Sequence, residues 1–141
     1  MKKIFSTAIN TNSVNTWLLL ARVATGAFML THGIPKLQYL LAGKISFGDP
    51  IGIGSTPSFV LVVFAEVVCS ILLMLGLATR FASIVLIINM GVAAFVALGN
   101  QPIGKKELPL LYLVLLIGIF IIGGGKYAVD SLLHRKGRSR Y

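Results

Sequence analysis

The chain has 141 residues, of which 56% are hydrophobic and only 12% are charged, whereas soluble domains carry about 25% charged residues. Together with a mean hydropathy of +0.89, this composition excludes a soluble globular protein and indicates a membrane protein. The formal net charge of +9 does not indicate nucleic-acid binding, because the basic residues are spread over the ends of the apolar runs.

Four apolar runs approach the length of about 20 residues that crosses the hydrocarbon layer of a bilayer. Because lipid offers no hydrogen-bond partner to the backbone, each run is predicted to form a helix. The predicted spans are residues 16–31, 58–78, 81–98 and 108–123, with an outer loop at 32–57 and a basic tail at 126–141. The predicted fold class for residues 1–141 is one all-α membrane domain, a four-transmembrane-helix bundle.

The first span is predicted to be retained rather than cleaved as a signal peptide. A polar stretch at residues 10–15 precedes Trp17, and Arg22 interrupts the apolar run. No clear cleavage site of small residues follows, so the run does not match a signal sequence.

The charges beside the spans predict which side of the membrane each helix end faces, because cytoplasmic ends carry an excess of Lys and Arg. One side has Lys36, Lys44, Lys105 and Lys106. The other side has the larger set, Lys2, Lys3, Arg80, Lys126, Arg135, Lys136, Arg138 and Arg140. Both termini are therefore predicted to be cytoplasmic, with a tail that either touches anionic lipid head groups or is simply solvated.

The segment "THGIPKL", Thr31 to Leu37, follows the first predicted span. Gly33 and Pro35 are predicted to end the helix here. The start of the last span is expected at the same membrane level, which gives a candidate outer-side cluster of His32, Lys36, Glu107 and Tyr112. Glu107 either contacts one of the two basic residues, or the cluster only anchors the helix ends at the interface.

Glu66 lies near the middle of the second span, where a charge costs about 2.5–3.5 kcal/mol on insertion scales. It therefore needs a partner or a proton. Arg22 is the other charge inside the predicted spans, and its guanidinium could hold the carboxylate in a fixed geometry. An Arg22–Glu66 pair either locks the first helix to the second or forms a ligand or proton site, and neither role excludes the other.

Helical spacing places further residues beside this pair. The shared face is Arg22, Gly26, Met29 and Gly33 on the first helix, and Val62, Glu66, Cys69, Leu73 and Gly76 on the second. Small residues on these faces permit close helix packing. Asn89, in the third span, is a candidate to complete a ligand-binding or proton-relay site with Arg22 and Glu66, and an interhelical hydrogen bond is its alternative role.

The chain offers little to a metal or a covalent cofactor. Cys69 is the sole cysteine, so it cannot form a disulfide within the chain or carry out dithiol exchange, and a core position is expected for it. His32 and His134 are predicted at opposite membrane sides and cannot sandwich one haem iron. No metal site and no covalently bound cofactor are therefore expected.

Several short motifs occur in a defined order: Arg22, "HGIPKL" from His32 to Leu37, Glu66, "GLATR" from Gly76 to Arg80, Glu107, Tyr112 and "GGGKYAVD" ending at Asp130. In this order and spacing the chain resembles the DoxX family over nearly its whole length. The resemblance implies a small bacterial inner-membrane protein. Some members are described as subunits of membrane oxidoreductases, including one that oxidises thiosulfate and reduces quinone.

The function that this resemblance implies is an accessory or quinone-facing subunit of a membrane oxidoreductase complex, with quinone as the candidate ligand at the intramembrane Arg/Glu site. The sequence has no self-contained catalytic motif. The alternatives are a non-enzymatic assembly or chaperone-like partner protein and, third, a small-solute carrier that acts as an oligomer. The expected partners are the lipid bilayer and a protein partner or second copy, and no nucleic acid.

Overall fold

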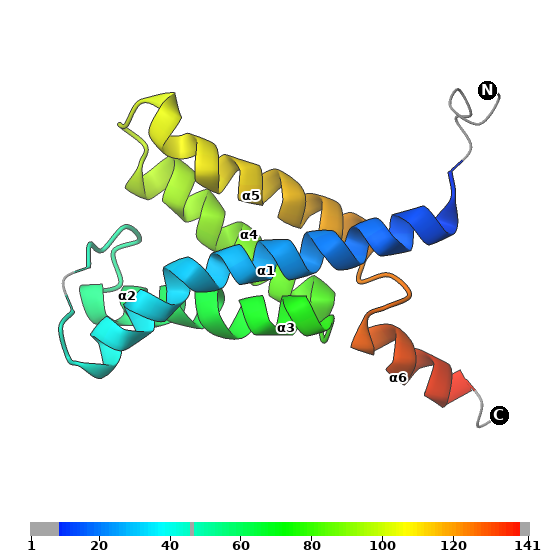
Figure 1. The fold of residues 1–141 in the computed structure, drawn as a ribbon. Helices are drawn as coiled ribbons and strands as arrows, with labels where there is room; N and C mark the ends of the chain where they lie inside the picture. The colour runs from blue at the N-terminus through cyan, green and yellow to red at the C-terminus, as the bar shows by residue number, and fades with distance from the viewer. Residues whose placement is uncertain (1–8, 46, 139–141) are drawn as a thin grey trace.

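The computed structural model describes residues 9–45 and 47–138, and throughout these residues the regular structure is helical (Figure 1). The elements in chain order are α1 (Thr11–Leu41), α2 (Ser55–Val63), the π-helical η1 (Phe64–Cys69), α3 (Ser70–Leu75), α4 (Thr79–Gly91), the π-helical η2 (Val92–Ala97), α5 (Ile103–Ile122) and α6 (Val129–Arg138). Three residues of the predicted basic flanks, Lys2, Lys3 and Arg140, lie outside the described part of the chain. For residues 134–138, which include His134, only the backbone is described.

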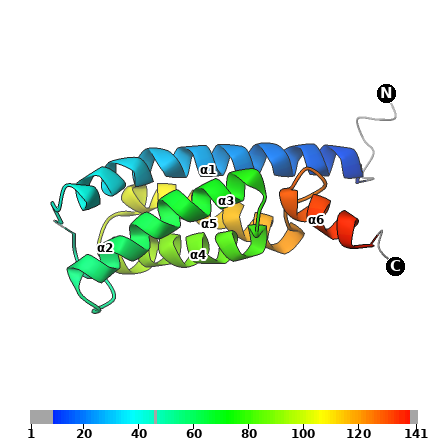
Figure 2. The same cartoon turned by 90° about the horizontal axis from the view of Figure 1, so that it is seen from below.

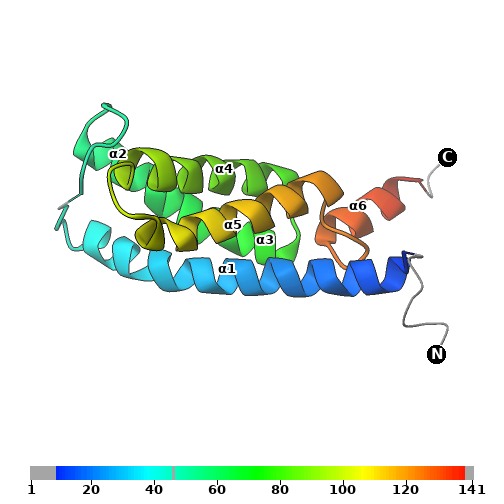
Figure 3. The ribbon, with the colours of Figure 1, turned by 90° about the horizontal axis from the view of Figure 1, so that it is seen from above.

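The helices form a bundle of long rods. α2, η1 and α3 make one continuous rod, Ser55–Leu75, and α4 continues through η2 as another, Thr79–Ala97. Figures 2 and 3 show the start of α1 and the helix α6 at one end of the bundle, which we name the tail end. The segment 42–54 and the turn between η2 and α5 lie at the opposite end, the loop end.

Within the described residues, three rods are long and apolar enough to cross a membrane: Thr11–Leu41, Ser55–Leu75 and Thr79–Ala97. α5 packs along α4 and has 20 residues, with Lys105, Lys106 and Glu107 near its start. The remainder of α5 exposes large apolar side chains, for example Leu111, Val114 and Ile121. The chain is thus an all-helical, multi-pass membrane protein.

α1 begins earlier and ends later than the predicted span 16–31. At its start, Oδ1 of Asn10 accepts hydrogen bonds from the backbone N–H groups of Asn12 (3.0 Å) and Ser13 (3.4 Å), which caps the helix. At its end, the predicted break at Gly33 and Pro35 is wrong, because Pro35 lies inside the helix and the helix continues to Leu41.

Contacts with the second rod explain why α1 continues, although a proline inside a helix costs about 3 kcal/mol. A Cβ added to Gly33 would lie 2.8 Å from the carbonyl oxygen of Glu66, so the two backbones are in close contact. One turn later, Nζ of Lys36 lies 2.6 Å from Oε1 of Glu66. The first contact holds α1 against the second rod just before Pro35, and the second requires the chain to stay helical past it.

The remaining boundaries differ less from the prediction. The spans expected at 58–78 and 81–98 correspond to the rods Ser55–Leu75 and Thr79–Ala97, and a helix, Ile103–Ile122, lies where the span 108–123 was expected. The outer loop, expected at 32–57, is confined to residues 42–54, and the tail, expected at 126–141, contains the additional helix α6. The second rod ends at Gly76, whose backbone is left-handed with φ 71°, a conformation that favours glycine.

The core lies on the faces that helical spacing predicted. The buried residues of α1 include Arg22, Gly26, Met29 and Gly33, and those of the second rod include Glu66, Cys69 and Leu73. A Cβ on Gly26 would lie 2.8 Å from the carbonyl oxygen of Ser70. Because two glycines let α1 approach the second rod so closely, the polar groups on both faces are enclosed in the bundle.

Candidate functional site

Glu66 lies in the π-helical segment η1, in the interior of the second rod, and is only 3% exposed. A π-helical turn widens a helix locally and occurs frequently at functional sites. The neighbouring rod contains a second such segment, η2. The buried carboxylate is therefore held where the backbone departs from regular α-helical geometry.

Lys36 is the direct partner of Glu66. Nζ of Lys36 lies 2.6 Å from Oε1 of Glu66, the one ion pair found between residues that the structure describes. The side chain of Glu66 is 4% exposed and that of Lys36 is 32% exposed. The lysine thus connects the buried carboxylate to the molecular surface, with its charged group at the inner end.

Asn89 also contacts Glu66, through an interhelical hydrogen bond, which was the alternative role considered for it. Its Nδ2 donates to Oε1 of Glu66 at 3.3 Å, so both donors use the same carboxylate oxygen. The other oxygen, Oε2, is buried, and no donor in the described part of the chain reaches it. A buried acceptor without a donor costs about 1–3 kcal/mol, which makes Oε2 the natural position for a proton, a water molecule or a ligand.

The predicted ion pair between Arg22 and Glu66 is wrong. Arg22 is completely buried, and its Nη1 donates to the backbone carbonyl of Leu73 at 3.4 Å. The antiparallel register of α1 and the second rod explains the difference. Gly33 is the α1 residue beside Glu66, and Arg22 lies about three helical turns, or about 16 Å, closer to the tail end.

Arg22 belongs to a separate polar group at the tail end. A Cβ on Gly76 would collide with its Nη1, and Asp130 is close enough for its charge to act on the guanidinium. Nε and Nη2 of Arg22 are buried without an acceptor among the described groups. A ligand-binding role for Arg22 stays a prediction, and the geometry separates it from Glu66.

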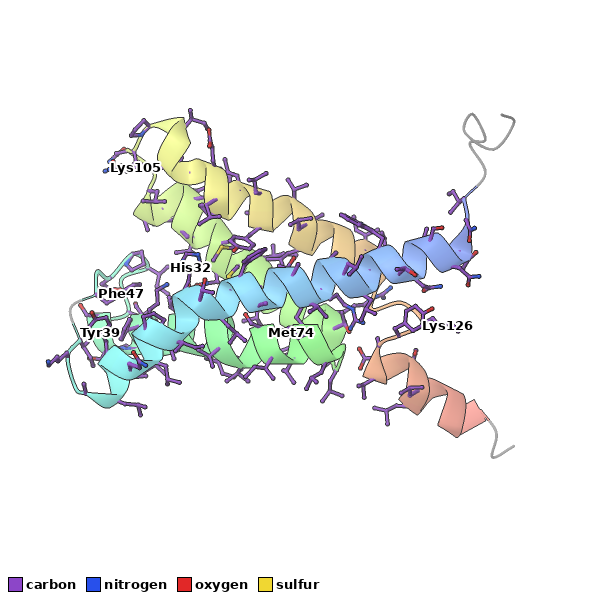
Figure 4. All side chains as sticks on the ribbon, in the orientation of Figure 1. His32, Tyr39, Phe47, Met74, Lys105 and Lys126 are labelled. Atoms are coloured by element: carbon purple, nitrogen blue, oxygen red, sulfur yellow. The ribbon has the colours of Figure 1, made fainter. Side chains whose placement is uncertain are left out.

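A cavity of about 220 Å³ lies in the loop-end half of the bundle, between α1 and η1 on one side and α4, η2 and α5 on the other. Its charged and polar lining consists of His32, Lys36, Glu66, Lys105 and Tyr112. Figure 4 shows His32 at the place where α1 and the α4–α5 pair diverge, and Lys105 near the start of α5. The cavity therefore unites the intramembrane carboxylate with three residues of the predicted outer-side cluster.

Glu107, the fourth residue of that cluster, lies apart from the cavity. It is exposed and does not line the cavity, and its predicted contact with Lys36 or His32 is not found among the described side chains. The reason is that Lys36 turns inward to Glu66. Lys105 lines the cavity, although it was not among the predicted site residues. Its position two residues before Glu107 was the signal that could have suggested it.

An apolar groove of about 270 Å³ lies between the second and third rods. It is lined mainly by aliphatic side chains, among them Leu61, Ile88 and Val92, and Asn89 is a polar group in its wall. Asn89 also donates to Glu66, so one side chain contacts both the groove and the carboxylate.

Asp130 is the acidic residue of the polar group at the tail end that also contains Arg22. Its carboxylate accepts hydrogen bonds from the backbone N–H groups of Ala78 (2.7 Å) and Thr79 (2.8 Å) and from Oγ1 of Thr79 (2.8 Å). Burial opposes ionisation, but these hydrogen bonds and the charge of Arg22 outweigh it and hold the pKa of Asp130 below its usual range. The motifs "GLATR" and "GGGKYAVD" thus meet in space, although the sequence analysis gave Asp130 no role.

No group of three or more His, Cys, Asp or Glu side chains within the described ranges is arranged to hold a metal ion. Cys69 is buried and free, in the core position expected for it. It lies in the same π-helical segment as Glu66.

Comparison with known proteins relates the chain to a family and to a bacterial relative. The family model described as DoxX matches residues 17–99, a range that contains Lys36, Glu66 and Asn89 but ends before α5. An uncharacterized protein from Haemophilus influenzae is 32% identical over 127 residues, which cover 85% of this chain and 92% of the relative. No solved structure gives a significant match.

Proposed function

The chain belongs to the DoxX family, and we propose that it is a quinone-binding accessory subunit of an oxidoreductase complex in the bacterial inner membrane. The observation that carries this proposal is Glu66, whose carboxylate is buried at a cavity and has one oxygen that no donor of the described residues reaches. Ionisable residues inside membrane spans are expensive and usually mark ligand or proton sites.

We further propose four spans with both termini in the cytoplasm. α5 runs alongside α4 and has the 20 residues that a span needs. With α5 as a fourth span, the start of α1 and the helix α6 lie on one side of the membrane (Figures 2 and 3). The excess of Lys and Arg at that end favours the cytoplasm, so the Glu66 cavity would lie nearer the outer face.

The residues of the cavity fit the head group of a quinone. Its carbonyl oxygens are hydrogen-bond acceptors, and Lys36, Lys105 and Tyr112 provide donors around the cavity. At about 220 Å³, the cavity is smaller than the roughly 300–1,000 Å³ of most small-molecule sites, so it would take a head group rather than a complete lipid. The apolar groove lined by Asn89, whose side chain also donates to Glu66, offers a surface for an apolar chain.

A bound quinone would supply electron and proton acceptance, and the chain would supply the path for protons. Glu66 is suited to hold a proton at Oε2, because that oxygen has no donor in the described part of the chain. Lys36 contacts the same carboxylate and is one-third exposed. Glu66 could therefore give this proton to an oxygen of the head group and take another from the loop end through the polar side chains of the cavity, Lys36 and His32 among them.

The test is native mass spectrometry of gently extracted protein, with the released lipid-soluble molecules identified after denaturation. Wild-type protein is expected to carry quinone, and Glu66→Gln to retain at least tenfold less. Glu107→Gln is the matched control, since it makes the same chemical change at an exposed carboxylate outside the cavity. Tyr112→Phe is a milder cavity variant that removes one hydroxyl and keeps the ring.

Folding of each variant is checked by thermal unfolding in the same detergent. Quinone retained by folded Glu66→Gln and Tyr112→Phe proteins would reject the Glu66 cavity as its site. Wild-type protein that carries no quinone, and binds none when quinone is added, would reject the proposed function altogether.

A further inference from the structure

A second cavity, of about 490 Å³, lies at the tail end between the start of α4 and the start of α6. Its lining includes Thr79, Arg80, Phe81, Gly124, Asp130 and Leu133. None of these residues lines the Glu66 cavity, so this site is independent of the proposed quinone-binding function.

Arg80 gives this cavity a cationic group that an anion could contact. Asp130 is its one acidic lining residue, and its two carboxylate oxygens accept three hydrogen bonds from Ala78 and Thr79. The carboxylate of Asp130 thus caps the start of α4. Arg80 is exposed and forms no ion pair with any described residue, so its guanidinium is available to a phosphate group.

The rim of the cavity is apolar. Phe81 is 55% exposed and Leu133 is 59% exposed, and the neighbouring Leu132 is 60% exposed. This rim lies where α3 and α5 end, which is the level of the lipid head groups if the rods span the membrane. A cationic group beside exposed apolar side chains at that level matches a phospholipid better than a soluble anion.

The chain that follows this site is strongly basic. α6 leaves the bundle obliquely from the tail end (Figures 1 and 3), and Arg135, Lys136 and Arg138 follow Leu133 in its sequence. Anionic lipid attracts basic segments beside a membrane. Attraction of this general kind would bring lipid to the tail end, and Arg80 would then bind it at a defined place, because this side chain lines the cavity.

We propose that the cavity between α4 and α6 binds the head group of an anionic phospholipid. The phosphate contacts Arg80, and the acyl chains pack against Phe81 and Leu133. The lipid thereby fixes α6 against the end of the bundle.

The test uses tryptophan fluorescence in lipid vesicles. The native Trp17 is replaced by Phe, and Leu133→Trp places a single reporter at the rim. Brominated phosphatidylglycerol is expected to quench this tryptophan at least threefold more than brominated phosphatidylcholine at the same mole fraction. Adding Arg80→Gln should lower this ratio and leave only the part that the general attraction of the basic tail contributes.

Lys44→Gln is the charge-matched control, since it removes one positive charge at an exposed position of the loop end. It should leave the quenching ratio unchanged. Equal quenching by both lipids, or an equal fall in the ratio for Arg80→Gln and Lys44→Gln, would reject a defined site. Loss of the preference on adding millimolar inorganic phosphate at constant ionic strength would assign the site to a soluble anion instead.

Discussion

Nζ of Lys36 and Oε1 of Glu66 lie 2.6 Å apart and join α1 to the middle of the second rod. Lys36 lies one turn beyond the point where Gly33 touches the backbone of Glu66. The ion pair and the close glycine contact therefore reinforce one another. Together they keep α1 helical through Pro35 and give the buried carboxylate its cation.

Lys36→Met should destabilise the protein, because it leaves Glu66 buried without its cation. Breaking a buried ion pair costs about 3–5 kcal/mol. Because Lys36 is partly exposed, we expect a smaller loss here, about 2–3 kcal/mol. The double variant Lys36→Met/Glu66→Gln should recover most of the loss. Reversible denaturation in detergent, analysed as a double-mutant cycle, measures both effects; additive single effects would contradict the pairing.

Gly33→Ala should weaken the packing of α1 on the second rod. The new Cβ would lie 2.8 Å from the carbonyl oxygen and 2.9 Å from the carbonyl carbon of Glu66, so backbone must move. We expect a loss of about 1–3 kcal/mol, as for other overpacked positions.

Gly118→Ala is the matched control for this substitution. Gly118 lies inside α5, and a Cβ there meets nothing within 4 Å. The control should be neutral or stabilising by up to about 1 kcal/mol, because alanine favours helix. Equal thermal stability of the two variants would show that α1 and the second rod are not in close contact.

Asp130→Asn should lower stability near neutral pH by weakening the cap on α4. The pKa of Asp130 is depressed in the folded protein, so its carboxylate stabilises the fold above the unfolded pKa of about 3.9. That contribution is lost as the pH falls further, toward the folded pKa. The melting temperatures of wild type and variant should therefore differ at pH 7 and converge below about pH 4. A constant difference across this range would contradict the ionised cap.

The proposed topology predicts the accessibility of single cysteines introduced after Cys69→Ala. Lys44→Cys, in the loop-end segment, should react with a membrane-impermeant maleimide in intact spheroplasts. Lys126→Cys, at the tail end (Figure 4), should react only after lysis. The reverse pattern would invert the orientation, and labelling of both in intact cells would contradict an even number of spans.

Much of the architecture could be predicted from hydropathy and helical spacing. Apolar runs near 20 residues are helical in lipid because the backbone has no other partner. The faces carrying Arg22, Gly26 and Glu66 were predictable for a similar reason, since the α-helical period is fixed. The π-helical segments η1 and η2 were not predicted, because one local widening leaves no clear mark on the hydropathy pattern.

Hydropathy and helical spacing were enough to predict that the chain lies in a membrane as helices and that a carboxylate at position 66 needs a partner. That this partner is Lys36 rather than Arg22 became evident only from the packed helices. The reason is that helix register depends on packing between distant segments, here on Gly33 against Glu66 and Gly26 against Ser70. The same packing overrode the local signal of Pro35, because contacts with another rod can outweigh the cost of one proline in a helix.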